Sequence, residues 1–284
     1  MNRIPESELI LNEDGSIYHL HLYPDQIGDL IFTVGDPDRV AEVSKYFDSL
    51  DFQNSKREFV THSGRIGGRK VSAMSTGMGT DNVEIFMNEL DALVNIDLEN
   101  RTIKKELTQL QIVRLGTSGA IQPNIPVGSL LLSEKAIGID TMMNFYPDSS
   151  KNQDLARAFK EFLKLDFTPY QTEASLALSA KANQGFIQGI TLTAPGFYAP
   201  QGREIRYSTK ISDYAQKIQE FEYGGQSITN LEMETAGYYA LGELLGHEVL
   251  SLNAILANRA LGTFDSNPSR TVEKLIEKAL SIFV

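Results

Sequence analysis

The chain has 284 residues, 42% of them hydrophobic and 22% charged, which is the composition of a globular protein with a sizeable core. Its net charge of −11 excludes a protein that coats nucleic acid or an anionic membrane by bulk electrostatics. The absence of cysteine excludes disulfides, thiolate nucleophiles and cysteine zinc sites. We expect one domain over residues 1–284, located in the cytoplasm, because the chain shows no signal-like start and no apolar run that could span a bilayer.

The first half of the chain predicts strands that alternate with helices. His19 and His21 would share one face of a strand, but no "HExxH" spacing accompanies them, so we expect no transition-metal site. The elements that follow are a buried strand over Leu30–Val34, a helix from Pro37 or Asp38, a strand over Lys70–Ser75, a helix with Ile85, Leu90 and Leu93 on its apolar face, and a strand in "LQIVRLGTSGAI" that enters a glycine-rich turn. The charged segment 95–109 between them is a surface excursion or an extra helix.

The second half continues the alternation. Its predicted elements are a strand in "SLLLSEKAIGID", helices over Leu155–Leu163 and Glu173–Ala182, a strand in "GITLTA", a strand and helix in "SITNLEMETAGYYALGELLG" ended by Gly246, a strand that ends at Asn258 and Arg259, and a helix in "SRTVEKLIEKALSIF". This order favours a mixed or mostly parallel sheet covered by helices.

Three glycine-bearing segments follow predicted strands: "GDPDR" at 35–39, "STGMGT" at 75–80 and "RLGTSGA" at 114–120. Each could be only a tight turn, but ligands of open α/β sheets bind where such loops gather. None matches the phosphate loop of nucleotide triphosphatases or the dinucleotide fingerprint, so those ligands lack support. Arg39, Arg114, Thr117 and the amide of Gly35 or Gly116 could instead surround one phosphate dianion, with Arg57 as a third arginine.

The loop "APGFYAPQGREIRY", residues 194–207, carries unusual side chains for a loop broken by proline and glycine. Phe197 offers a flat aromatic face, and Gln201 and Arg203 offer an amide and a guanidinium. The loop is either an ordinary turn with one buried side chain or a binding site for a planar ligand.

The segment "NLEMET" places Glu232 and Glu234 on the same side if extended, with Met233 between them. Glu234 could simply be a favourable charge at the start of the next helix. It could also accept hydrogen bonds from sugar hydroxyls while Met233 packs on the apolar face of the sugar.

Together these motifs resemble the nucleoside phosphorylases of the uridine phosphorylase type. The resemblance extends from about Tyr18 to Arg259 and rests on "GDPDR", "REF", "STGMG", "RLGTSGAIQPNIPVGSLLLSE", "FYAPQGR" and "NLEMET" in this order. It implies a pentosyltransferase with a single α/β domain in three layers, in which helices flank a mixed, barrel-like central sheet. It also implies a homo-oligomer, either a dimer or a hexamer built as a trimer of dimers, with sites shared between subunits.

The resemblance further implies a role for each matching residue. Arg203, Gln201 and Glu234 would carry catalysis, and Arg57 and His19 would reach into a neighbouring subunit's site. The phosphate site would comprise Gly35, Arg39, Arg57, Arg114 and Thr117. The nucleoside site would comprise His19, Thr117, Phe197, Gln201, Arg203, Met233 and Glu234. Glu58 and Glu232 match two ligands of an interfacial K⁺, although Asn82 stands where the family usually has serine.

The expected reaction is the reversible phosphorolysis of uridine to uracil and ribose 1-phosphate in nucleoside salvage or catabolism, with phosphate as co-substrate and no required cofactor. Purine enzymes of this fold are similar in placing an aspartate after a late strand, whereas that strand here ends "AILANRALG". The alternatives are deoxyuridine or thymidine as substrate, a purine nucleoside phosphorylase or nucleosidase, and a non-catalytic nucleoside-binding protein.

Overall fold

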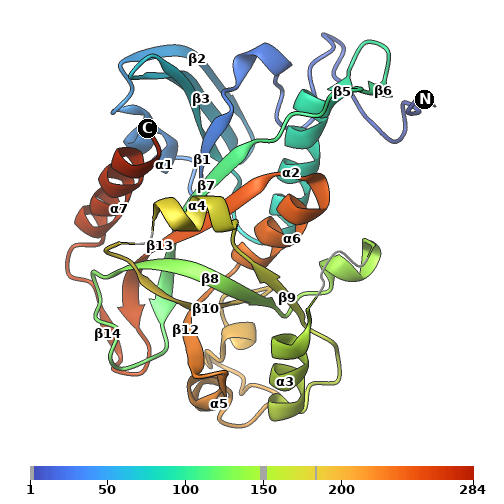
Figure 1. Cartoon of the computed structure of the whole chain (residues 1–284). Coiled ribbons are helices and arrows are strands. Elements are labelled where there is room, and N and C mark those ends of the chain that lie inside the picture. The colour runs from blue at the N-terminus through green and yellow to red at the C-terminus, as the bar shows by residue number, and fades with distance from the viewer. Residues whose placement is uncertain (1–2, 148–151, 183) are drawn as a thin grey trace.

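The computed structural model describes residues 3–147, 152–182 and 184–284, which are organised around one 12-stranded mixed sheet (Figure 1). The fold class expected from the sequence is confirmed: parallel and antiparallel pairs coexist, and helices flank the sheet. No helix in these three ranges is long and apolar enough to cross a membrane.

Five strands of the sheet close into a barrel. They are β7 (Gln111–Ala120), β8 (Leu130–Gly138), β10 (Ile187–Thr193), β12 (Gln226–Glu232) and β13 (Glu248–Asn258). Around the ring, β7 pairs with β12, β12 with β10, β10 with β8, β8 with β13, and β13 with β7. The β7–β12 and β8–β13 pairs are antiparallel and the other three are parallel. Closure leaves these strands without a free edge.

The remaining strands lie outside this barrel and pair with its strands or with one another. An open wing continues from β7 through β1 (Leu30–Val34), β4 (Arg69–Ser75), β3 (Phe59–Ile66) and β2 (Ser49–Lys56). The short strands are β9 (Tyr170–Glu173) on β8, β11 (Glu222–Tyr223) on β12 and β14 (Thr263–Phe264) on β13. A separate hairpin joins β5 (Ile96–Asp97) to β6 (Thr102–Ile103).

Helices cover the sheet on both sides (Figure 1). The helices are α1 (Arg39–Ser44), α2 (Thr80–Asn95), α3 (Asp154–Leu163), α4 (Leu176–Lys181), α5 (Tyr214–Glu220), α6 (Thr235–Leu245) and α7 (Pro268–Phe283), with 3-10 turns η1 (Pro24–Gln26), η2 (Met142–Phe145) and η3 (Ala199–Gln201). The pair α2 and α6 lies side by side, and Phe86 packs edge-on against Tyr238 with ring centroids 6.3 Å apart. Both helices begin beside the cavity described below.

Most strands and helices predicted from the sequence are confirmed, including Leu30–Val34 and the helix ended by Gly246, which adopts a left-handed conformation with φ +81°. The glycine-rich turn at 114–120 is wrong, because these residues continue β7 and pair with β13 as far as Ala120. The helix expected at 173–182 begins only at Leu176, where the Ser175 hydroxyl caps it by accepting a bond from the Leu178 amide.

The structure also decides two predictions made for segment 95–109 and for the pair His19 and His21. Segment 95–109 contains the β5–β6 hairpin, so the surface excursion is confirmed and the extra helix is wrong. His19 and His21 do not share a strand face, because residues 18–20 form a turn and His21 has the left-handed φ of +53°.

Truncation of Phe86 tests the packing that holds α2 against α6. The Phe86 side chain is fully buried, so we expect Phe86→Ala to lower the free energy of unfolding by about 3–5 kcal/mol. Phe145 is 86% exposed, and Phe145→Ala is the matched control with an expected change below about 0.5 kcal/mol. Urea denaturation of both variants measures the difference, and equal losses would contradict the packing.

Candidate active site

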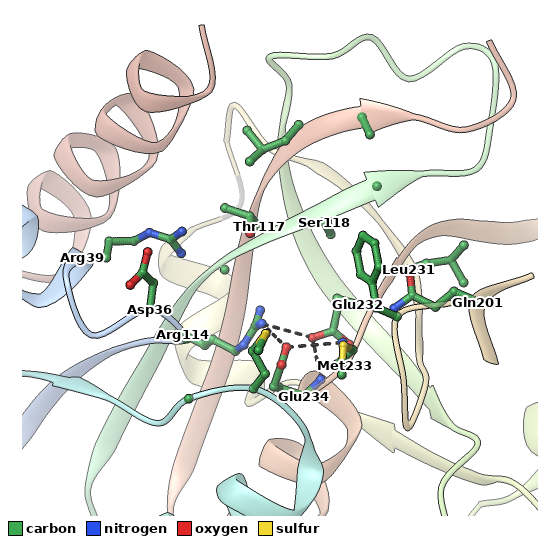
Figure 2. A pocket seen from close by; sticks show the side chains of 18 of the residues that line it. Asp36, Arg39, Arg114, Thr117, Ser118, Gln201, Leu231, Glu232, Met233 and Glu234 are labelled. Atoms are coloured by element: carbon green, nitrogen blue, oxygen red, sulfur yellow. Dashed lines mark hydrogen bonds and ion pairs between the residues drawn. The ribbon is translucent and has the colours of Figure 1, made fainter. Parts of the chain in front are cut away.

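A cavity of about 660 Å³ lies at the carboxyl ends of several sheet strands. Its walls are contributed by the residues after β1 and β4, the second half of β7, the β12–α6 junction, the end of β13 and the loop after β10. Figure 2 shows Arg39 and Gln201 on opposite sides of this cavity, with Arg114, Glu232 and Glu234 between them. The lining includes the sequence-predicted residues Gly35, Arg39, Glu58, Arg114, Thr117, Phe197, Gln201, Arg203, Glu232, Met233 and Glu234.

The floor of the cavity is a buried ion-pair cluster (Figure 2). Arg114 Nη2 lies 2.5 Å from Glu234 Oε2 and 3.4 Å from Glu232 Oε2. All three residues are buried. The two carboxylates therefore lie on the same side of the chain, as the extended "NLEMET" segment predicts, and both face the guanidinium.

The two glutamates have different local partners. Glu232 Oε2 accepts hydrogen bonds from the Glu234 and Thr235 amides at 3.0 and 2.9 Å, so Glu232 caps the start of α6. Among the described residues, Glu234 Oε1 accepts only the Gly79 amide, at 2.9 Å. Because a carboxylate oxygen can accept two hydrogen bonds, Glu234 Oε1 retains capacity for one ligand donor.

The electrostatics of the floor follow from its burial. Burial opposes the charge of Arg114, but Glu234 and Glu232 outweigh that effect and hold its pKa above the ordinary arginine value. Burial raises the pKa of Glu234, and the Arg114 guanidinium opposes this shift. The ionisation of Glu234 therefore depends on where Arg114 is held.

A glycine makes this placement of Arg114 possible. The side chain folds back over its own strand, and a Cβ atom on Gly116 would lie 1.8 Å from Arg114 Nη1. Any larger residue at 116 would displace the guanidinium.

The Arg39 end of the cavity contains a cation that has no ion-pair partner among the described residues. Arg39 is half-buried at the start of α1, and within the described ranges no carboxylate lies within ion-pair distance of it. Burial lowers the pKa of Arg39, Asp36 opposes that shift and Arg114 adds to it. Gly35 and Thr117 line the same cavity. A partly desolvated, unpaired guanidinium favours an anion in this position.

The opposite end of the cavity is built by the loop after β10, which includes η3. Arg203 Nη1 donates to the Phe197 carbonyl at 2.6 Å and to Gln201 Oε1 at 2.5 Å. Its guanidinium carbon lies 3.7 Å from the centroid of the Phe197 ring, and Gln201 is buried. The aromatic ring, amide and guanidinium are thus already assembled as one group, whereas Phe197 is half-exposed and is no core anchor.

The sequence indicated no role for Arg259, which anchors this loop through two of its backbone carbonyls. Its guanidinium donates to the Gln201 carbonyl and, at 3.2 Å, to the Gly202 carbonyl. Burial lowers the pKa of Arg203 to about 10, and the nearby Arg259 adds to the shift. The sequence feature that could have identified Arg259 is its position immediately after β13. The cavity residues that the sequence left unassigned are Asp36, Pro37, Gly77, Met78, Asn82, Ser118, Gly119, Leu231, Leu256, Ala257 and Phe264.

Two residues of the expected site do not line this cavity. His19 Nδ1 lies 2.6 Å from Glu89 Oε1 on α2, and the His19 amide donates to the same carboxylate. Arg57 is exposed at the β2–β3 turn, where it has the left-handed φ of +55°. Glu58 in the same turn does line the cavity.

The possible cation ligands Glu58 and Glu232 both border the cavity. Glu232 Oε1 accepts the Thr193 hydroxyl at 2.5 Å, and its Oε2 is bound to the start of α6. Across the part of the chain that the structure describes, no three histidine or acidic side chains gather as a metal-binding group.

The fold and cavity place the chain in the class of α/β proteins built on a closed mixed barrel with a cavity at the carboxyl ends of its strands. The family model "Phosphorylase superfamily" matches residues 29–283, so the chain belongs to this family. Family membership and the relatives below identify it as an enzyme, a pentosyltransferase of the nucleoside phosphorylase family.

Several characterised proteins are similar over most of the chain. The uridine phosphorylase of Thermococcus kodakarensis is 26% identical over 95% of this chain and 87% of its own length. A purine nucleoside phosphorylase of the DeoD type from Listeria monocytogenes is also 26% identical, over 82% of this chain and 84% of its own. A Trypanosoma brucei nucleoside phosphorylase with uridine phosphorylase activity superimposes with a TM-score of 0.85 at 25% identity, covering 96% of this chain and 99% of that one.

Gly116→Ala tests the placement of Arg114. The added methyl group would overlap Arg114 Nη1, so we expect kcat/KM for phosphorolysis to fall about 100-fold through misplacement of the guanidinium. Gly119→Ala is the control in the same strand, because its Cβ would make an ordinary contact of 3.6 Å with Arg259. Steady-state kinetics that showed equal activities for the two variants would contradict the assignment.

Proposed function

We propose that the protein phosphorolyses uridine reversibly to uracil and ribose 1-phosphate. The observation that carries this proposal is the chemistry of the cavity at the Phe197 end, where the groups that face a ligand are the donors Arg203 and Gln201. The buried carboxylates Glu232 and Glu234 are paired with Arg114 on the floor. A base bound beside Arg203 would therefore leave as an anion stabilised by hydrogen bonds.

The residues at and after the end of β13 support a pyrimidine rather than a purine base. Asn258 is buried, and its amide donates to the Gln122 and Ile125 carbonyls at 2.9 and 2.8 Å. Asp265 accepts the Thr271 hydroxyl and the Asn267 amide, and these bonds lower its pKa. Neither residue is suited to protonate a purine ring, whereas the uracil anion is delocalised onto oxygens that Arg203 and Gln201 can bind.

The phosphate would bind against Arg39, Thr117 and the remaining Nε donor of Arg114. A phosphate oxygen attacks the anomeric carbon while the bond from that carbon to the base nitrogen breaks, and the electron pair of this bond leaves with the base. The sugar passes through an oxocarbenium-like state that the adjacent phosphate dianion stabilises. Glu234 Oε1 would accept a sugar hydroxyl, and the Met233 thioether would pack on the sugar.

The names of the similar proteins support this reading, since curated uridine phosphorylases from Thermococcus kodakarensis and Haemophilus influenzae match over most of the chain. The similar DeoD-type protein keeps a purine nucleoside phosphorylase as the second candidate. The cytoplasmic location, and a homo-oligomer in which Arg57 and His19 serve a neighbouring cavity, are parts of the same proposal. So is an interfacial K⁺ held by Glu58, whereas Glu232 already binds the start of α6.

A substrate panel tests the reaction. Ultraviolet absorbance is followed for uridine, deoxyuridine, thymidine, cytidine, inosine and adenosine, each with and without inorganic phosphate. We expect base release from uridine only with phosphate. Faster release from inosine would establish the purine candidate, release without phosphate would establish a nucleosidase, and binding without release would establish a nucleoside-binding protein.

Arg203→Ala tests the base site. Loss of a donor to the departing base should lower kcat/KM for uridine by about 100- to 1,000-fold while the melting temperature changes little, because Arg203 lies at the cavity and not in the core. Arg206→Ala is the matched control, since Arg206 is an exposed arginine of the same loop that contacts the Tyr207 ring. Full activity of Arg203→Ala would remove Arg203 from the base site.

A further inference from the structure

The interior of the barrel contains a chain of polar side chains that we name the polar belt: Arg114, Asn253, Ser133, Thr191, Asn230 and Ser118. Arg114 Nη1 donates to Asn253 Oδ1 at 3.3 Å, and Asn253 Nδ2 donates to Ser133 Oγ at 3.2 Å. Thr191 Oγ1 lies 2.6 Å from Ser133 Oγ and 2.8 Å from Asn230 Oδ1. Asn230 Nδ2 then donates to Ser118 Oγ at 2.9 Å.

The polar belt passes through every strand of the closed barrel. Arg114 and Ser118 are on β7, and β12, β10, β8 and β13 each contribute one of the other four residues. Both ends of the polar belt line the cavity, at Arg114 on the floor and at Ser118 beside Thr117. The polar belt is therefore continuous with the active site at two points.

A stability role alone does not explain this arrangement. The four residues between the two ends have no exposed surface, and burying a polar group stabilises a fold less than burying an apolar side chain of the same shape. Hydrophobic side chains fill the interior of many small barrels. Here the polar groups satisfy one another and leave a fixed acceptor, Asn253 Oδ1, pointing at Arg114.

The direction of the bonds fixes the orientation of the Asn253 amide. Arginine can only donate, so the group that faces Arg114 Nη1 must be the oxygen of Asn253. The nitrogen then faces Ser133 and Ser251, both of which can accept. Ser251 Oγ adds a second, longer contact to Arg114 Nη1 at 3.4 Å.

We propose that Asn253 is a positioning residue for the reaction, because it holds one edge of the Arg114 guanidinium and thereby turns the other edge onto Glu234. The two Nη groups are committed to the protein, Nη1 to Asn253 and Ser251 and Nη2 to Glu234 and Glu232. The Nε–H group, which has no partner among the described residues, is left for the phosphate. This inference rests on the proposed phosphate and ribose sites.

Asn253→Leu removes the acceptor while keeping the number and branching of the side-chain heavy atoms. We expect kcat/KM for phosphate to fall about 10- to 100-fold through loss of orientation. The low-pH limb of the pH–rate profile should also move to higher pH. Burial raises the pKa of Glu234 and Arg114 opposes that shift, so a displaced Arg114 lets the pKa rise further and the active carboxylate is lost at a higher pH. Steady-state kinetics from pH 5 to pH 8 measure both effects.

Asn95→Leu is the matched control for the generic cost of losing a buried asparagine. Asn95 bonds to Asp91 and Thr108 near the end of α2, and it does not line the cavity. An Asn253→Leu variant that loses stability like Asn95→Leu, yet keeps the wild-type phosphate kinetics and low-pH limb, would overturn the proposal. If Asn253→Leu does not fold, Ser251→Ala replaces it, with a smaller shift of the same limb expected and an unchanged limb as the contrary result.

The activity of the wild-type enzyme separates a failure of the proposed function from a failure of the positioning role of Asn253. If it is inactive on uridine but phosphorolyses another nucleoside, uridine phosphorolysis is wrong, and the Asn253 comparison is made with that nucleoside, because the Arg114–Asn253 bond does not involve the base. If it turns over none, titration calorimetry with inorganic phosphate gives the comparison, and equal affinities of wild type and Asn253→Leu would overturn the positioning role.

Discussion

The site depends on the buried contact between Arg114 and Glu234. Burying two charges costs several kcal/mol per ion unless each is paired and hydrogen-bonded, and both conditions are met here. Arg114 belongs to β7, whereas Glu234 follows β12, and these strands pair where the ring closes, at Asn230 with Ala120 and Leu231 with Gly119. Closing the barrel and assembling the cavity floor are therefore one structural event.

The contact also organises the elements around the cavity. Glu234 accepts the amide of Gly79, whose φ of +94° favours glycine, and so it connects the start of α2 to the start of α6. Glu232 caps α6 from the preceding strand while it faces the same guanidinium. Each carboxylate thus combines a bond to a helix start with a contact to Arg114. The contact of Glu234 and Met233 with a sugar stays a prediction.

The sequence allowed most of the fold to be predicted because buried runs such as Leu30–Val34 and glycine stops such as Gly246 are local signals. It misled at 114–120, where the glycines that suggested a turn lie inside a paired strand and one of them, Gly116, leaves room for Arg114. The candidate residues were recognised from their local motifs, the family resemblance assigned them to one site, and the structure places most of them together. The bonds of Arg259 and Asn253 could not be predicted, since they join residues more than 50 positions apart through sheet closure.

The two ends of the cavity differ in what a ligand must replace. Arg39 has no ion pair with any described residue, so an anion that binds there would gain a contact without breaking one of these. Arg203 already bonds to Phe197 and Gln201 and covers the aromatic ring, so a base that binds there as proposed would have to exchange those bonds for its own. The free energy of base binding at Arg203 would then be the difference between similar bonds broken and formed. This difference would grow as negative charge develops on the departing base. Arg203 would therefore stabilise the transition state more than the bound substrate, because the guanidinium gains most from its new partner when that partner is an anion.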